Sequence, residues 1–372
     1  MGQSPKSEFY NDNFEGMPFL QGNKTFGDKY PSFELYTTSI KKVAEKSSVL
    51  MSVRAPVGDL NIAQEDICIG RGVCGLQMKK GDNEFLYYLL KANISHLINK
   101  ESGTVFGSIN KNDIETFEVT LPEDSKDQQK ILTILKNIDK KIEVSKELNK
   151  NLHLQRKELF KHWFIDFSSS NYELIDTAFG LIPKSWNIYD FKEILTKRTE
   201  KSNDVSIPMF SVTNTGIHPR EDKFNKKLSA SSSKFKLIYK NDLVFGMSRE
   251  ILNWGLMEEK IGGVSSAYHI FKINKDLVNP FYLKGFIENY MFYFKDIIKP
   301  ASREGQGIDQ NVLFIKQIYV PPENIFKEFY QIDIHFNNFI ELNNNQIEKL
   351  ICLRDTLLPK LMSGEIDVSD IN

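Results

Sequence analysis

The chain has 372 residues, of which 41% are hydrophobic, and its 48 Lys and Arg nearly balance 49 Asp and Glu, giving a formal net charge of −1. This length and composition are sufficient for two domains with separate cores, and the balanced total argues against a simple polycationic nucleic-acid binder. The three scattered cysteines, Cys68, Cys74 and Cys352, form no CxxC pair and predict free thiols in a reducing compartment. No apolar segment is long enough for a signal peptide or a membrane span, so we expect a soluble, cytoplasmic protein.

The charge is unevenly distributed along the chain. Residues 197–240 contain ten Lys or Arg and four Asp or Glu, whereas residues 323–372 contain four and nine, respectively. A basic strip is most often a solvated face, but it is also the electrostatic signature of nucleic-acid binding. Charge alone leaves both interpretations open.

The first globular segment is predicted to cover residues 1–121. Residues 49–53, 67–69 and 117–121 have the composition of short strands bounded by Gly, Pro or Asp. Residues 85–98 have the apolar spacing of a helix. The segment is therefore expected to be mixed α and β.

A long helix is predicted from Ser125 to Trp163, within residues 122–167. No Gly lies between Gly107 and Gly180, and Ser125 followed by Gln128 fits a capping box. Apolar residues recur at seven-residue spacing. Others lie three positions further on, as Ile134 and Leu148 do, or four positions further on. Together they predict a coiled-coil seam. The seam residues are Ile131, Leu135, Ile138, Ile142, Leu152 and Leu159.

A second helix is predicted over residues 325–358, within residues 321–372, and it repeats the first. A shift of 198 residues maps the first seam onto the second, although Leu135 and Leu148 fall on Asp333 and Gln346. The seam residues of the second helix are Phe329, Phe336, Ile340, Leu350 and Leu357, with Ile332 alongside them. The chain is therefore expected to alternate globular segment and long helix twice.

The second globular segment is predicted over residues 168–320, and its order of elements follows the first. Met17-Pro18 is matched by Ile207-Pro208, and Ile109-Asn110 by Ile308-Asp309. Because the cores match while the loops differ, we expect two related sites with different specificities. The first copy is expected to lack the opening strand, including the counterpart of Trp186, that precedes Pro208 in the second.

Motifs for catalysis are weak throughout the sequence. Residues 70–75 satisfy GxGxxG, but no helix follows them, so a tight turn is the better interpretation. Residues 279–282, Asn-Pro-Phe-Tyr, resemble the target-adenine motif of amino-methyltransferases without its second Pro, and they fit the start of a helix. The sequence contains no P-loop motif, no HExxH motif and no zinc-type Cys spacing, so we expect neither a metal site nor catalysis.

Polar loop residues are the remaining candidates for function. Arg, Asn, Gln and Lys side chains can bind base edges and phosphates of DNA, and such residues recur at equivalent places in both copies. In the first copy the candidates are Gln21, Asn23, Lys24, Thr25, Arg54, Ser108, Asn110 and Lys111. In the second copy they are Ser211, Thr213, Asn214, His218, Arg220, Lys226, Lys227, Arg249, Arg303, Gln306 and Gln310.

Several segments make the chain resemble the specificity (S) subunits of type I restriction-modification systems. Residues 55–63 (APVGDLNIA) and 68–72 (CIGRG) resemble a recognition-domain motif, and residues 181–186 (LIPKSW) resemble the opening of a second such domain. Residues 128–131 with 138–142 are similar to the first long helix of that family, and residues 353–366 are similar to its C-terminal end.

The resemblance implies an α+β fold in which two similar target-recognition domains are separated by two long helices packed as an antiparallel coiled coil. It also implies a non-catalytic role: each domain reads one half of a bipartite, asymmetric DNA target, and the helices set the spacing and dock adenine-methyltransferase (M) subunits. Motor-nuclease (R) subunits would join that complex, and S-adenosylmethionine, ATP and Mg would bind to the partner subunits. Two alternatives remain: a coiled-coil scaffold without DNA specificity, and a self-sufficient modification enzyme that uses Asn279 to Tyr282.

Overall fold

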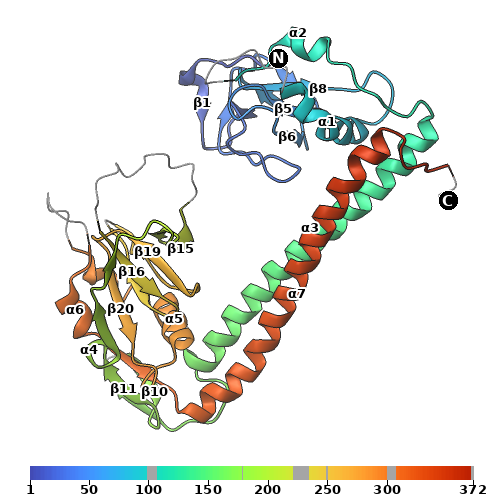
Figure 1. Ribbon diagram of the computed structural model, residues 1–372. Coiled ribbons are helices and arrows are strands. Elements are labelled where there is room, and N and C mark those ends of the chain that lie inside the picture. The colour runs from blue at the N-terminus through green and yellow to red at the C-terminus, as the bar shows by residue number, and fades with distance from the viewer. Residues whose placement is uncertain (99–106, 178, 221–233, 249, 300–306, 370–372) are drawn as a thin grey trace. The chain divides into compact units, whose positions relative to one another are not determined.

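The computed structural model describes residues 1–98, 107–177, 179–220, 234–248, 250–299 and 307–369 (Figure 1). Its internal contacts define two units, one formed by Met1–Asn149 with Glu341–Asn372 and the other by Lys150–Ile340. Two helices of 40 residues each, α3 (Ser125–Phe164) and α7 (Glu323–Met362), contribute a segment to both units. The alternation of globular segments and long helices predicted from the sequence is confirmed.

The first unit contains two small sheets. One has the order β1-β3-β2-β7-β4 and the other the order β6-β5-β8. Their strands are β1 (Tyr10–Asn11), β2 (Met17–Leu20), β3 (Tyr36–Thr37), β4 (Val43–Ala44), β5 (Val49–Ser52), β6 (Leu60–Ile62), β7 (Ile67–Ile69) and β8 (Val73–Leu76). The strands predicted at 49–53 and 67–69 are thus present, and the buried side chains of β5 and β7 are core residues.

The strand predicted over residues 117–121 is wrong, because the described residues there form no strand. Its counterpart β21 (Gln317–Val320) pairs antiparallel with β11 (Asn187–Asp190) in the second unit. Apolar composition favours a strand, but a strand forms only as part of a ladder, and no β-ladder of the described residues includes residues 117–121. Val119 and Leu121 instead pack against the apolar cluster around the long helices.

The predicted helix at residues 85–98 is confirmed as α1 (Asn83–Ile98), and it attaches the sheets to the helix pair. Phe85 and Tyr88 of α1 share an apolar cluster with Ile131 of α3 and Leu358 of α7. Polar contacts add to this attachment: Glu84 accepts hydrogen bonds from Lys29 (3.0 Å) and from Lys136, and the Tyr88 hydroxyl donates to Asp139, at 2.5 Å. A short helix, α2 (Lys111–Glu115), follows later in the chain.

The second unit repeats this plan with more strands. Its sheets have the orders β12-β20-β17-β18, β13-β16-β19, β14-β15, β10-β9 and β11-β21. The strands not yet given are β9 (Leu174–Thr177), β10 (Gly180–Pro183), β12 (Leu195–Arg198), β13 (Lys201–Ser202), β14 (Phe210–Thr213), β15 (Gly216–Pro219), β16 (Phe235–Tyr239), β17 (Leu243–Phe245), β18 (Trp254–Leu256), β19 (Ile261–Val264) and β20 (His269–Ile273). The helices are α4 (Phe191–Ile194), α5 (Pro280–Asn289) and α6 (Gln310–Phe314).

Helix α5 corresponds to α1 and packs on the helix pair through aromatic side chains. Asn279 caps α5 by accepting a hydrogen bond of 2.8 Å from the Phe281 N–H, so the Asn-Pro-Phe-Tyr segment has a structural role. Tyr282 is buried and donates its hydroxyl to the Tyr319 carbonyl at 2.7 Å. Gly285 lies against Phe160 of α3, where a Cβ atom would come within 2.4 Å of the ring. This contact requires glycine.

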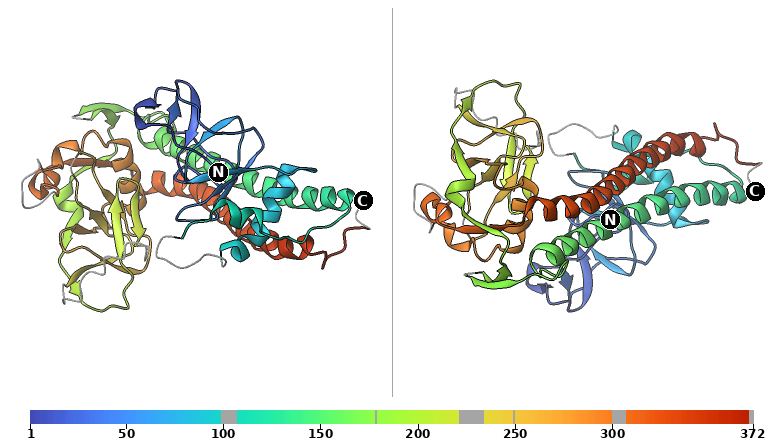
Figure 2. Two further views of the ribbon diagram at one scale, coloured as in Figure 1. Left: turned by 90° about the horizontal axis from the view of Figure 1, so that it is seen from above. Right: turned by 90° about the horizontal axis from the view of Figure 1, so that it is seen from below.

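In the first unit, segments of α3 and α7 run side by side and antiparallel (Figure 2). Asp139 accepts a hydrogen bond of 2.9 Å from Arg354, and further along α3 the buried Asn149 bonds the amides of Asn343 and Asn344. Leu148, which was expected in the seam, is 47% exposed and lies outside it, so that expectation is wrong. Asn149, which follows Ser145 by one helical turn, faces α7 instead.

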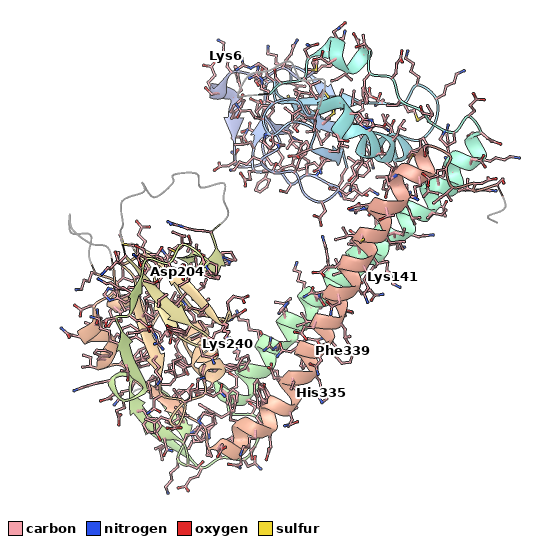
Figure 3. All side chains as sticks on the ribbon, in the orientation of Figure 1. Lys6, Lys141, Asp204, Lys240, His335 and Phe339 are labelled. Carbon is pink, nitrogen blue, oxygen red and sulfur yellow. The ribbon has the colours of Figure 1, made fainter. Side chains whose placement is uncertain are left out.

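In the second unit the same two helices also pack antiparallel. Arg156 binds Asp333, whose side chain is fully buried, while Phe164 packs against Phe329 with ring centroids 4.7 Å apart. Ile332 is 41% exposed and therefore flanks the seam rather than filling it. Phe339, 59% exposed, projects from α7 away from α3 (Figure 3).

Apart from Leu148 and Ile332, which are exposed, the seam residues expected from the sequence are buried or half-buried. These are Ile131, Leu135, Ile138, Ile142, Leu152, Leu159, Phe329, Phe336, Ile340, Leu350 and Leu357. The predicted capping box at Ser125 is wrong, since α3 begins at that residue and the Asp124 carboxylate accepts from the Lys126 N–H at 2.8 Å. Helix α7 also extends beyond its predicted end and includes Pro359 in its last turn.

Candidate nucleic-acid interfaces

A polar cleft of about 400 Å³ in the first unit collects five of the predicted residues. These are Gln21, Asn23, Lys24, Thr25 and Arg54. Gln21 to Thr25 follow strand β2, and Arg54 follows β5, so the two strands bring their ends to one place. Arg71, which the sequence analysis did not select, also lines the cleft.

The contacts within this cleft separate engaged side chains from available ones. The Asn23 amide donates to Asp59 at 2.5 Å, and the Lys24 ammonium lies 2.7 Å from Glu34. Arg54 and Arg71 are exposed, and neither guanidinium forms an ion pair with any residue that the structure describes. These two groups are the ones best able to bind a phosphate or a guanine edge.

Arg71 is held in place by the turn that joins β7 and β8. The Gly72 N–H donates to the Gln21 carbonyl at 3.1 Å, and a Cβ atom on Gly72 would come within 2.6 Å of the same oxygen. The segment thus forms the tight turn predicted from the sequence. In the sequence, the only local indication that Arg71 belongs to a candidate site is its position between two turn glycines.

The remaining candidates of the first copy lie beside Arg54. Ser108 forms an isolated antiparallel bridge with Arg54. Asn110 caps helix α2, its side chain accepting from the Asp113 N–H at 3.1 Å, and Lys111 lies 3.3 Å from Glu115. The Asn110 side chain is therefore already engaged in a helix cap.

In the second unit the hairpin β14–β15 carries five of the candidates. Ser211 pairs with His218 and Thr213 with Gly216, which leaves Asn214 at the exposed turn. Thr215 lies 2.9 Å from the His218 ring, and Arg220 is exposed at the end of the hairpin. Asn214 and His218 also line a cavity of about 760 Å³.

Gln310 lies apart from that hairpin, at the start of α6. Its amide nitrogen is 2.5 Å from Nδ1 of His269, the first residue of β20. Burial is the largest cause of the lowered pKa of His269. The nearby charges of Lys236 and Lys197, which belong to the basic strip, lower the pKa further. The charge of Arg198, in the same strip, is neutralised by the buried Asp242, with which it forms an ion pair of 2.7 Å.

Five candidates of the second copy lie outside the described residues. They are Lys226, Lys227, Arg249, Arg303 and Gln306. Within the described ranges, no group of three or more His, Cys, Asp or Glu side chains is arranged to hold a metal ion. No helix in the same ranges has the length and apolar character needed to cross a membrane.

Comparison with known proteins gives consistent matches. The family model described as the type I restriction modification DNA specificity domain matches residues 1–154. The putative type I restriction enzyme MjaX specificity subunit of Methanocaldococcus jannaschii is 42% identical over 164 residues, which cover 43% of this chain and only 38% of that relative. The MjaIX specificity subunit of the same organism is 27% identical over 353 residues, 89% of this chain and 80% of the relative.

A solved chain from work on complex assembly and conformational transition of the type I R-M system has a similar fold. It has a TM-score of 0.53 and 13% identity, with 94% of this chain and 92% of that chain covered. The likeness shows that the two chains share a fold with mixed α/β domains and long helices. The chain is therefore similar to the specificity (S) subunits of type I restriction-modification systems, over residues 1–154 by the family model and over 89% of its length by the MjaIX relative.

Proposed function

We propose that this chain is the non-catalytic subunit that selects the DNA target of a type I restriction-modification complex. Each globular domain reads one half of a bipartite, asymmetric sequence. The observation that carries this proposal is the repetition of one fold with different polar groups. These groups are Arg54 and Arg71 in the first unit and the β14–β15 hairpin with the half-buried Gln310 in the second. Divergent readers on a duplicated scaffold fit two different half-sites.

The paired helices α3 and α7 serve in this proposal as the spacer and as the docking surface for two adenine-methyltransferase subunits. Motor-nuclease subunits join the complex for cleavage. S-adenosylmethionine, ATP and Mg bind to those partners. Equilibrium binding of labelled S-adenosylmethionine to the isolated chain and to its complex with the methyltransferase tests this division, and saturable binding to the isolated chain would contradict it.

The decisive experiment maps adenine methylation across a genome after co-expression of the methyltransferase with and without this chain. A bipartite methylated motif that appears only with the chain is the expected result. If methylation is independent of the chain, the alternative of a coiled-coil scaffold without DNA specificity is favoured.

Variants can assign the half-sites. Exchange of residues 211–220 should change one half of the motif only, whereas Arg54→Ala with Arg71→Ala should affect the other half. Lys41→Ala is the control, because Lys41 is an exposed cation of the same unit that does not line this cleft. Insertion of one heptad into α3 should change the spacer and leave both half-sites unchanged.

A further inference from the structure

His269 and Gln310 form a pair of polar side chains at the junction of β20 and α6. Both residues are half-buried, and the Gln310 amide nitrogen lies 2.5 Å from Nδ1 of His269. Gln310 is the first residue of α6, and the preceding Asp309 caps the helix by accepting from the Asn311 N–H at 2.9 Å. The backbone of Gln310 is therefore fixed by a helix start, and its side chain is fixed by the imidazole.

The backbone around the pair is also held on both sides. The Asp309 N–H donates to the Ile297 carbonyl at 2.7 Å, and Ile298 forms an antiparallel bridge with Ile308. A Cβ atom on Gly307 would lie 3.2 Å from Nε2 of His269, so this glycine leaves room for the ring. The imidazole thus occupies a confined position between Gly307 and Gln310.

The surroundings of the ring are cationic. Burial and the charges of Lys236, Lys197 and Lys299 lower the pKa of His269 to about 4. Lys236 also donates to the carbonyl of Tyr268, the residue before His269, at 2.6 Å. At neutral pH the ring is uncharged, so one of its nitrogens is an acceptor while the other carries the proton.

We propose that His269 is a positioning residue that holds the Gln310 amide in one orientation for the readout of an adenine. Nδ1 accepts the N–H that lies anti to the amide oxygen, which leaves Oε1 and the second N–H together on the free edge of Gln310. This acceptor and donor match N6–H and N7 of adenine in the major groove. The inference rests on the proposed function, and it identifies a contact and its supporting group within the second recognition domain.

The test uses the complex of the full chain with its methyltransferase and compares His269→Leu, His269→Asn and Gln310→Ala. Asn places an amide oxygen near the position of Nδ1 and can accept the same hydrogen bond, whereas Leu cannot. We expect His269→Leu and Gln310→Ala to lose selectivity for adenine at the same single position of one half-site. The ratio of affinities for adenine and a substituted base should fall about 5- to 150-fold, the equivalent of one bidentate base contact.

Further readouts separate positioning from a general structural effect. His269→Asn should retain the wild-type motif, and the double variant His269→Leu with Gln310→Ala should be no less selective than either single variant. Selectivity of the wild type should stay constant from pH 6 to pH 8, because burial and the facing Lys197, Lys236 and Lys299 keep the ring neutral there. Lys275→Ala, an exposed change in the same unit, is the control for removal of a charge.

Each alternative result has a defined meaning. The inference is overturned if His269→Leu keeps the wild-type motif while Gln310→Ala alters it, if His269→Asn behaves like His269→Leu, or if neither residue affects base selectivity. In all three cases a wild-type bipartite motif would leave the proposed function intact. Absence of any motif that depends on the wild-type chain would instead refute the proposed function and this inference together.

Discussion

Arg156→Met should destabilise the unit formed by Lys150–Ile340 by about 3–5 kcal/mol, the usual cost of removing one partner from a buried ion pair. Arg156 donates to both carboxylate oxygens of Asp333, the Nη2 contact being 2.9 Å. The side chain of Asp333 is 0% exposed and that of Arg156 is 18% exposed, so solvent cannot replace the missing partner. Among the described residues, the Asn337 amide at 3.2 Å would then be left to stabilise the carboxylate.

The repeat supplies the compensating change. Asp333 lies 198 residues after Leu135, which is fully buried at the equivalent seam position of α3. Asp333→Leu should therefore recover most of the stability that Arg156→Met removes, because a buried ion pair can often be replaced by apolar side chains without cost. Asp333→Leu alone should be unfavourable, since it leaves the Arg156 guanidinium without its partner.

Calorimetry and hydrogen exchange of the α3 and α7 backbone amides within Lys150–Ile340 measure this cycle. A loss of 3–5 kcal/mol corresponds to a fall in Tm of about 6–20 °C for a unit of this size. Lys161→Met, which removes an exposed charge from the same helix, is the control and should change little. A cost below about 1 kcal/mol for Arg156→Met, or a double variant no more stable than Arg156→Met, would refute the reasoning.

Three further predictions concern the first unit. Leu148→Lys should change stability by less than about 0.5 kcal/mol, whereas Leu135→Ala should cost about 2–5 kcal/mol; equal costs in thermal melts would restore Leu148 to the seam. Arg54→Ala with Arg71→Ala should make the dependence of log K on log[salt] shallower by about 1 for each phosphate that is no longer bound, so an unchanged slope in DNA-binding titrations would exclude phosphate binding by these groups. Burial raises the pKa of Glu84, but hydrogen bonds from two lysines leave this pKa below its ordinary value. The stability that the ionised Glu84 contributes at pH 6 should therefore decline as the pH falls through the lowered pKa. Glu84→Gln should flatten this decline in unfolding experiments.

The helix pair was predictable because its signal is local and is repeated. Seven-residue spacing is set by the geometry of one helix, and the shift of 198 residues aligned two weak patterns into one. The choice between Leu148 and Asn149 was not predictable, because positions three and four residues along a helix both lie near the seam. Only the partner amides of Asn343 and Asn344 decide that Asn149 faces inward.

The strand predicted at residues 117–121 shows a different limit. Its apolar, β-branched composition favours a strand, but a strand also needs a neighbour to accept its backbone hydrogen bonds. Residues 317–320 pair with β11, whereas no β-ladder of the described residues includes residues 117–121. Composition therefore predicted a strand at residues 117–121, where none forms, whereas the equivalent residues 317–320 form β21.

The candidate sites were only partly predictable, since polar side chains in loops are distinguished by partners distant in sequence. Asn23 and Lys24 are engaged by Asp59 and Glu34, and neither partner could be assigned from spacing. His269 had no local signal at all, because its importance comes from a residue 41 positions away. Sequence reasoning thus selected loop residues that line one cleft in the first unit, but it did not show which of those side chains are already paired.

The contact between Gly285 and Phe160 sets a rule for domain exchange. A foreign recognition domain grafted onto these helices must present a residue without a side chain where its own helix crosses Phe160, because a Cβ atom at 285 would lie within 2.4 Å of that ring. A donor with alanine there would need a smaller residue in place of Phe160. The modularity of the architecture is therefore conditional: reading loops can diverge freely, whereas the joint that carries them restricts which modules are interchangeable.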